Sequence, residues 1–180
     1  MRGFGIANMY VQPGYLIRRA HQAATAAFAA ATADLDLTPV QFSALVAIKD
    51  NPDIDATRVS EMISFDRTTI GHVLGRLERK KLITRTDGVR DKRTKLIRLT
   101  RKGEATIRAV SRRVDEIAEI IFKPFSGGER AALLKLLARF RSGDQVAEAA
   151  SFARKGRFPA QGRPRSDGRN GHWPRHKNDR

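Results

Sequence analysis

The feature that most constrains the fold is residues 66–100, where an amphipathic helix runs directly into two short β-type segments joined by a cationic loop. Asp66 is a typical helix-capping residue. Four apolar residues after it follow the i, i+3, i+4, i+7 spacing of one buried helical face: Ile70, Val73, Leu74 and Leu77. The segments LITRT and TKLIRLT flank an Asp87-Gly88 turn signal, so they predict a β-hairpin with a cationic tip.

Two further helices are predicted before this segment. Thr38, Pro39 and Gln41 combine a capping box with proline at the first helical position, and Asn51-Pro52 ends the helix that they begin. Asp55 then caps the short segment ATRVSEMISF. Three short helices followed by a hairpin are the element order of a winged helix-turn-helix, so we expect a mainly α fold with a small β-hairpin wing.

The flanking segments predict longer helices. Residues 14–34 are rich in alanine, the best helix former, and their small side chains suit an interface better than a thick core. Thr100 is expected to cap one long helix from about 101 to 122, and a Ser126–Glu129 capping box opens the last helix. Residues 1–13 are expected to form an irregular arm. Residues 142–180, rich in Arg, Gly and Pro, are expected to form a disordered basic tail.

The positive charge is concentrated in the predicted helix and hairpin. Residues 66–102 hold 13 of the 35 Lys and Arg but only 4 of the 19 Asp and Glu, which is +9 of the total +16. A basic patch on a folded segment is the footprint of a polyanion partner, most often nucleic acid. A solvated charged face is the alternative, but such faces usually mix the two signs.

The outer face of the helix after Asp66 is suited to the major groove of double-stranded DNA. There threonine can meet a thymine methyl group, and arginine can pair with guanine or phosphate. The candidate residues for this contact are Arg67, Thr68, Thr69, His72 and Arg76. Gly71 and Gly75 each cost about 1 kcal/mol inside a helix. We interpret them as allowing close approach to another backbone or to DNA, with a tolerated surface glycine as the alternative.

The predicted hairpin tip, VRDKRTKL, places one acid among four basic residues. Arg93 suits a narrow minor groove, where the negative potential is enhanced. Asp91 would hold the Arg93 guanidinium in place through a charge-assisted hydrogen bond. Arg90, Lys92 and Lys95 would attract phosphate. The alternative is an ordinary surface ion pair worth at most about 1 kcal/mol.

The segment FDRTTIGHVLGRLERKKLITRTDGVRDKRTKLIRLTRKGEA, with Asp91-Lys92-Arg93, Leu99-Thr100 and Gly103, resembles the MarR family of bacterial transcriptional regulators over residues 14–141. The resemblance implies a winged helix-turn-helix at about 38–100 and a helical dimerisation region formed by residues 14–34 and 101–141. It also implies a homodimer that binds an inverted-repeat operator, with repression as the expected effect on transcription.

The resemblance further implies release from DNA by a small effector, often an aromatic carboxylate. Arg18, Arg19 and His21 in the first helix are candidate effector-binding residues, with plain solvation as the alternative. The chain has no cysteine, which excludes a thiol-dependent peroxide sensor, a disulfide framework and a cysteine zinc site. With no run of 18 apolar residues, the chain is expected to be cytoplasmic, without a membrane partner.

Two other classes of function compete with this interpretation. An enzyme is disfavoured because the sequence holds no nucleophile elbow, phosphate-binding glycine loop or paired carboxylates. We expect no cofactor and no metal. His172 and His176 are four residues apart, as metal ligands on a helix can be, but they lie in the predicted disordered tail. A non-specific nucleic-acid-binding or chromosome-associated protein is the other alternative. It would bind scrambled DNA with a steep salt dependence and lose little on substitution of Thr68 or Thr69.

Overall fold

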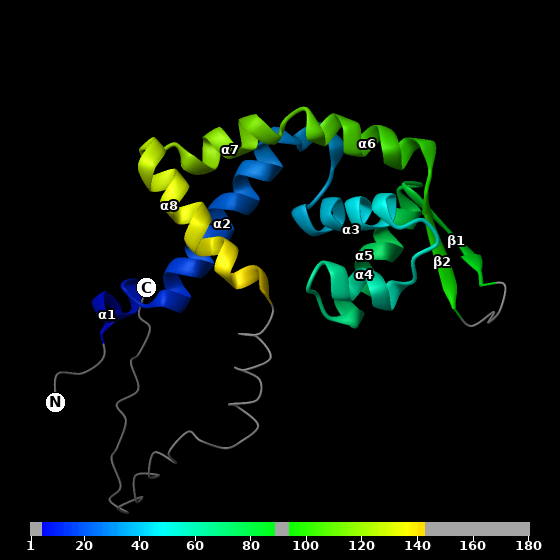
Figure 1. Ribbon diagram of the computed structural model, residues 1–180, viewed down its shortest axis with the longest axis horizontal. Helices are drawn as coiled ribbons and strands as arrows, with labels where there is room; N and C mark the ends of the chain where they lie inside the picture. Colours follow the sequence, from blue (N-terminus) through cyan, green and yellow to red (C-terminus); the bar gives the residue numbers. More distant parts are fainter. Residues whose placement is uncertain (1–4, 89–93, 143–180) are drawn as a thin grey trace, which may run out of the picture. The chain divides into compact units, whose positions relative to one another are not determined.

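A computed structural model of the protein describes residues 5–88 and 94–142 (Figure 1). The chain divides into two units, residues 1–136 and 137–180. In the described part of the first unit the elements are α1 (Ile6–Tyr10), α2 (Pro13–Ala31), the 3-10 turn η1 (Ala33–Leu35), α3 (Pro39–Asp50), α4 (Ala56–Met62), α5 (Arg67–Arg79), β1 (Ile83–Asp87), β2 (Lys95–Leu99), α6 (Arg101–Ser111), α7 (Val114–Phe122) and α8 (Gly127–Leu137). The described part of the second unit contains the end of α8 and the 3-10 turn η2 (Ala138–Ser142).

The predicted helix starts are confirmed. The Thr38 hydroxyl accepts a hydrogen bond from the Gln41 backbone N–H, and the Gln41 side chain accepts one from the Thr38 N–H, which completes the capping box of α3. The side chains of Asp55, Asp66 and Thr100 each accept one backbone N–H at the start of α4, α5 and α6, without the reciprocal bond of a capping box. Each cap satisfies backbone donors that the first helical turn leaves unpaired, so these starts depend only on residues within one turn.

The two strands form the predicted antiparallel hairpin, with Ile83 opposite Leu99 and Asp87 opposite Lys95. An isolated bridge between Ile54 and Ile97 also ties the loop between α3 and α4 to β2. Lys81, at φ 59°, lies in the left-handed region where α5 ends, and its N–H bonds back to the Glu78 carbonyl. This is a Schellman ending, and it turns the chain from α5 directly into β1.

One apolar core joins the helix-turn-helix to the hairpin and to α6. The inward face predicted for α5 is confirmed, because its four apolar residues are all buried. They pack with buried residues of α3, the hairpin and α6, among them Leu45, Ile48, Ile97 and Val110. The hairpin and α5 therefore share a single core and are held in a set geometry.

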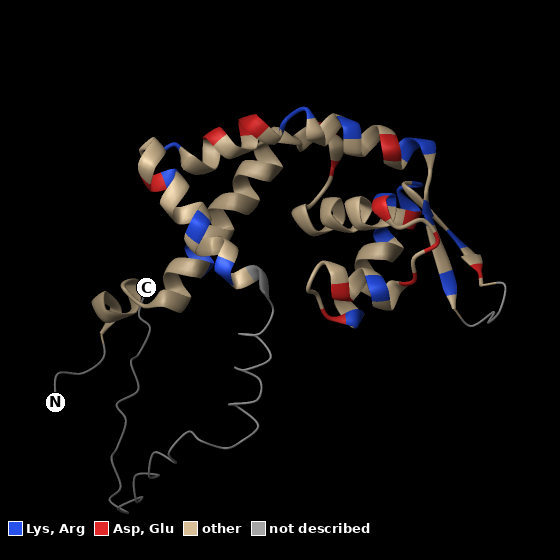
Figure 2. Cartoon of the chain, in the orientation of Figure 1, with Lys and Arg blue, Asp and Glu red and all other residues tan. Residues whose placement is uncertain are grey.

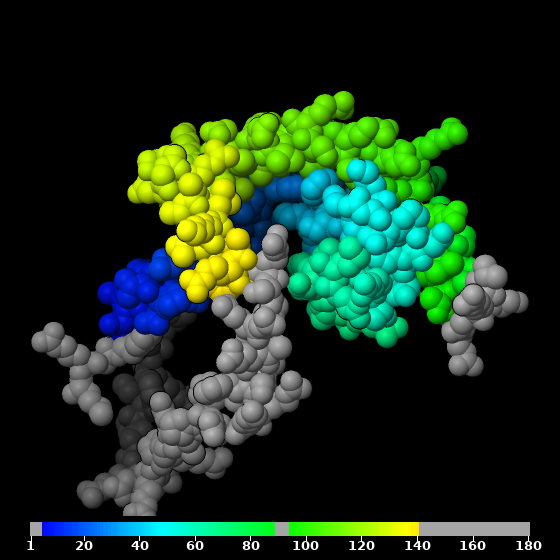
Figure 3. All heavy atoms as spheres, in the orientation of Figure 1, coloured from blue at the N-terminus to red at the C-terminus, as the bar shows by residue number. Residues whose placement is uncertain are grey.

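Two predictions about the flanking segments are wrong. The segment expected to be an irregular arm contains α1, in which the Asn8 side chain accepts a hydrogen bond from the Gly5 N–H at the helix start. The single helix expected over 101–122 is two helices, α6 and α7, with a turn at Arg112 and Arg113 (Figure 1). The space-filling view shows their atoms as one continuous strip despite that turn (Figure 3).

A non-local contact accounts for this turn. The Arg113 guanidinium forms a bidentate ion pair with the Asp34 carboxylate. It also donates a hydrogen bond to the Ala31 carbonyl at 2.9 Å. These hydrogen bonds from Arg113 lower the pKa of Asp34 below its ordinary value. Arg113 thereby joins the end of α2 to the start of α7, and α7 lies against α2 (Figure 1).

We expect Asp34→Asn to lower the free energy of unfolding at neutral pH, with a difference from wild type that disappears in acid. A carboxylate with a lowered pKa stabilises the fold above its unfolded pKa, near 3.9, and loses that contribution as the pH falls through the folded value. Urea unfolding at neutral pH and at a series of values falling below pH 4 measures the difference, which should shrink steadily as the pH falls. A deficit that is the same at every pH would show that the Asp34 charge does not stabilise this junction.

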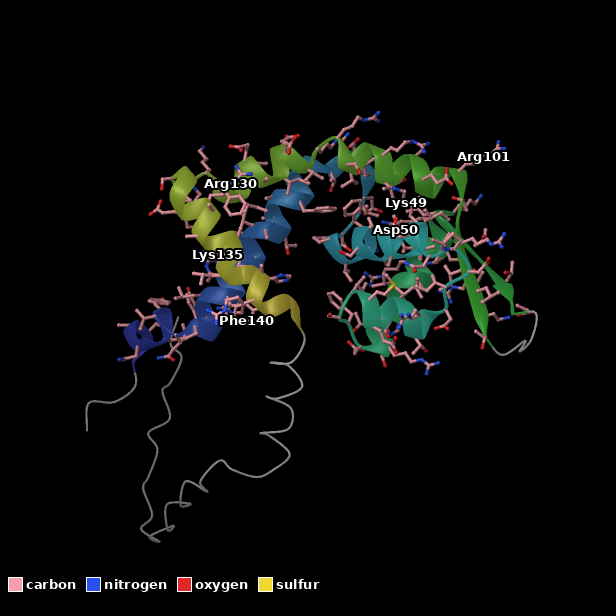
Figure 4. The ribbon with its side chains drawn as sticks, in the orientation of Figure 1. Lys49, Asp50, Arg101, Arg130, Lys135 and Phe140 are labelled. Carbon is pink, nitrogen blue, oxygen red and sulfur yellow. The ribbon has the colours of Figure 1, made fainter. Side chains whose placement is uncertain are left out.

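Helix α8 contacts α7 through a cation–π interaction and an ion pair. The Arg130 guanidinium, labelled in Figure 4, lies 4.9 Å from the centre of the Phe122 ring, and its Nη1 donates to the Glu119 carboxylate at 2.8 Å.

Several large apolar side chains of α2 and α7 are exposed, namely Leu16, Ile17, Val114 and Ile120. Among the described helices, none is long and apolar enough to cross a membrane.

Candidate nucleic-acid interface

Helix α5 presents a polar face opposite its buried one. Four of the five candidate DNA-contacting residues of this helix are exposed: Arg67, Thr68, His72 and Arg76. Because Ile70 and Leu74 are fully buried in the core below, the position of this face is set by the packing of α5. At 100° per residue Thr68, His72 and Arg76 lie within about 80° of one another on one exposed side of α5, whereas Arg67 is exposed on the opposite flank, at the start of the helix.

The fifth candidate, Thr69, has a structural contact of its own. Its backbone N–H donates to the Asp66 carboxylate at 2.8 Å, and its hydroxyl donates to the other carboxylate oxygen. Both hydrogen bonds lower the pKa of Asp66, the hydroxyl bond most strongly. Thr69 thus holds the first turn of α5, a role that the sequence pattern alone did not reveal.

The two glycines of α5 face open space. A β-carbon built on Gly71 or on Gly75 would meet no atom within 4 Å. Of the two reasons considered for these glycines, close approach to another backbone is therefore not found among the described residues. Close approach to DNA stays a prediction.

We expect Gly71→Ala and Gly75→Ala each to raise the free energy of unfolding by about 1 kcal/mol, since alanine loses less backbone entropy in a helix. The same substitutions should weaken binding to operator DNA, because the added methyl group lies on the face that we assign to the groove. Thermal unfolding and fluorescence anisotropy measure the two effects. A variant that gains stability without losing affinity would identify a tolerated surface glycine.

The hairpin adds positive charge beside α5. Figure 2 shows basic segments on both strands and at the start of α6. Lys95 of β2 is exposed and forms an ion pair with Asp87 across the hairpin. Arg98 forms a bidentate ion pair with Asp53, with nitrogen–oxygen distances of 2.5 Å. The predicted wing residues Arg90, Asp91, Lys92 and Arg93 lie outside the described residues.

A cavity of about 890 Å³ lies between α2, α3 and α5. Residues of α5 form one side of it, among them His72 and Arg76. The remaining lining comes from α2, from the loop before α5 and from the first turns of α3: His21, Thr25, Thr38, Pro39, Val40, Gln41, Ser43 and Phe65. A largely apolar pocket with a few polar groups is the usual form of a small-molecule site.

The three candidate effector residues of α2 are placed differently. His21 lines this cavity, whereas Arg18 and Arg19 are not among its lining residues. The Arg18 guanidinium lies 5.0 Å from the centre of the Tyr15 ring, and Arg19 donates to the Gln22 side chain at 3.3 Å. Sequence reasoning missed Arg76 as a lining residue, because the placement of α2 across the cavity from α5 depends on contacts between residues far apart in the chain.

Metal binding finds no support in the described ranges, 5–88 and 94–142, which contain no group of three or more His, Asp or Glu side chains placed to hold a metal ion.

Comparison with known proteins gives a consistent result. Residues 35–94 match the MarR family. The chain is 30% identical over 136 residues to the HTH-type transcriptional repressor NicR of Pseudomonas putida, a match that covers 76% of this chain and 86% of NicR.

Solved structures of the same kind are also similar. One is BpsR of Bordetella bronchiseptica, whose DNA binding is regulated by 6-hydroxynicotinic acid (29% identity, TM-score 0.67, 77% of this chain and 99% of that one). Another is a mutant of MarR from E. coli in complex with operator DNA (25% identity, TM-score 0.67, 76% of this chain and 98% of that one). With its helix-turn-helix, its basic hairpin and these relatives, the chain belongs to the MarR family of winged helix-turn-helix transcriptional regulators.

Proposed function

We propose that this protein is a repressor that binds an inverted-repeat DNA site as a homodimer and leaves it when a small aromatic acid binds. The observation that carries the proposal is the exposed face of α5, where Thr68, His72 and Arg76 lie opposite the buried apolar face, with Arg67 exposed at the start of the helix. A regulator needs no catalytic group, and we assign none. Because its target is chromosomal DNA, we place its action in the cytoplasm.

The homodimer is supported by apolar residues that are exposed outside the winged helix-turn-helix. Leu16 and Ile17 of α2 are 53% and 55% exposed, and Val114 of α7 is 49% exposed. Covering such side chains against a second copy removes apolar surface from water, which favours association. A twofold pair of α5 helices could then enter successive major grooves about 34 Å apart.

The cavity beside α5 is our proposed effector site. An effector carboxylate would pair with Arg76, while its aromatic body would lie against Phe65, Pro39 and Val73. His21 faces this site from α2. Because Arg76 belongs both to the cavity and to the exposed face of α5, bound effector and bound DNA would compete for the same guanidinium. BpsR, which 6-hydroxynicotinic acid regulates, supports the choice of an aromatic acid.

Fluorescence anisotropy tests the DNA-binding part of the proposal. Purified protein is titrated with the duplex upstream of its own gene and with a scrambled duplex, at several salt concentrations. We expect the upstream duplex to bind at least about a hundredfold tighter near physiological salt, within the range of specific regulators. If no genomic site is bound tighter than scrambled DNA, the protein is a non-specific binder and the proposal fails.

We expect His21→Ala to separate the two activities. The operator affinity should remain, while 6-hydroxynicotinic acid, used as a probe, should release DNA only at a clearly higher concentration than it does for wild type. Arg76→Gln should instead lose operator affinity as well, since the guanidinium is placed for both partners. Anisotropy with the probe titrated into preformed complexes measures both. An unchanged release curve for His21→Ala would remove this cavity as the effector site.

A further inference from the structure

A second, smaller cavity lies at the base of the hairpin. It has a volume of about 280 Å³ and is lined by residues of β1, β2, the first turn of α4 and the start of α5. Leu74 and Ile97 line it from the core, and three cationic side chains also line it: Arg67, Arg85 and Lys95. Arg85 was not among the residues to which the sequence assigned a role in binding.

Arg85 is the distinctive group of this cavity. It lies on the same face of β1 as the buried Ile83, and its side chain is only 26% exposed. Its Nε lies 3.3 Å from the Glu78 Oε2 and forms an ion pair with it. The geometry of that pair is not that of a hydrogen bond, and the buried Nη2 also has no hydrogen-bond partner among the described residues. Buried guanidinium donors are normally satisfied, and Nε is held by the Glu78 ion pair, so Nη2 is the donor left for an acceptor at the cavity wall, which it would reach through a small rotation of the side chain.

The other charges around the cavity also favour an anion. Within the described part of the chain, no acid pairs with Arg67. Lys95 pairs with Asp87, and both side chains are more than half exposed, so that ion pair is open to competition. Asp55 is an acidic residue of the lining, but its Oδ1 accepts the Arg58 N–H that caps α4 at 2.9 Å. The cavity thus carries three cations against one carboxylate that is already hydrogen-bonded.

We propose that this cavity holds a backbone phosphate of bound DNA, with Arg85 donating to its oxygens and with Arg67 and Lys95 beside it. The inference rests on the proposed function, namely that the chain binds duplex DNA through α5 and the hairpin. Arg67 opens α5 and Lys95 opens β2, so the cavity lies between the two elements that would read DNA. A guanidinium presents a planar set of donors that matches phosphate oxygens.

The first test is Arg85→Gln in the full-length protein, titrated by anisotropy with both the operator and the scrambled duplex. We expect affinity for both to fall by about tenfold for each copy of the site, since a hydrogen bond to a charged group contributes on that scale. The salt dependence should lose about 0.9 in slope per phosphate, or about 1.8 for a dimer. Arg108→Gln, an exposed arginine of α6 paired with Glu104, is the matched control and should change neither quantity.

These measurements distinguish this inference from the proposed function. A wild-type protein that does not discriminate operator from scrambled DNA would overturn the repressor proposal but leave the phosphate contact standing. Unchanged affinity and slope for Arg85→Gln would overturn the phosphate contact while the repressor proposal stands.

Glu78→Gln covers the case in which Arg85→Gln fails to fold. If Glu78 only occupies Arg85 until DNA arrives, its neutral replacement should tighten binding to both duplexes by severalfold. If the ion pair instead exists to orient the hairpin on α5, Glu78→Gln should weaken binding, and that result would overturn the proposal.

A final experiment separates DNA phosphate from a free anion. Neutral methylphosphonates replace single phosphates along the operator, and Arg85→Gln should lose no further affinity at the contacted position. In parallel, thermal unfolding is compared in sodium phosphate and sodium chloride at matched ionic strength. We expect no Arg85-dependent difference between the two salts. A stabilisation by phosphate that disappears in Arg85→Gln would reassign the cavity to a free anion.

Discussion

Gly103→Ala is expected to cost roughly 3 kcal/mol of folding stability, at the upper end of what forced overpacking does. A β-carbon at this position would overlap the Leu82 carbonyl oxygen and would lie 3.1 Å from the Leu82 carbonyl carbon. Both are backbone atoms, so no side-chain rotation can relieve the overlap. The same carbonyl oxygen accepts the Thr100 N–H at 3.0 Å, so moving it would also disturb the start of α6.

Urea unfolding measured by circular dichroism checks the expectation. Gly128→Ala is the matched control, because a β-carbon there meets nothing within 4 Å and the residue also lies in the first turn of a helix. The control should remain within about 0.5 kcal/mol of wild type. Equal stabilities for Gly103→Ala and Gly128→Ala would show that α6 can move away from Leu82 without loss.

Arg93→Ala is expected to weaken operator binding by roughly ten- to a hundredfold, more than alanine at any single arginine of residues 142–180. The reason is the resemblance of the hairpin tip to the MarR wing, together with the enhanced negative potential of a narrow minor groove. Loss of one well-placed arginine contact costs about 1–3 kcal/mol. Anisotropy with the mapped operator measures the change, and Arg157→Ala is a suitable comparison from the C-terminal segment.

Asp91→Ala should shift operator affinity in the same direction, because an arginine without its acidic partner loses its orientation. The two substitutions together should cost less than the sum of the separate losses if the acid acts through Arg93. Wild-type affinity for the mapped operator in Arg93→Ala would reject the role assigned to the wing arginine.

Patterns that span one helical turn or one hairpin were predictable. The inward face of α5, the caps at Thr38, Asp55 and Asp66, and the pairing of β1 with β2 all follow from residues a few positions apart. The break between α6 and α7 was not predictable in the same way. It depends on Arg113 meeting Asp34, residues separated by the whole winged helix-turn-helix.

The candidate sites show the same difference between features set by local sequence and features set by tertiary packing. The amino-acid sequence by itself determined the polar face of α5 and the positive charge beside it, because helical periodicity and charge are local properties. Only the tertiary structure decided that Arg76 lines a cavity with His21, that Arg85 holds a buried donor without a hydrogen bond, and why residue 103 is glycine. Each of these depends on the distance between segments far apart in the chain, which is set when the shared core packs and has no signature in local spacing.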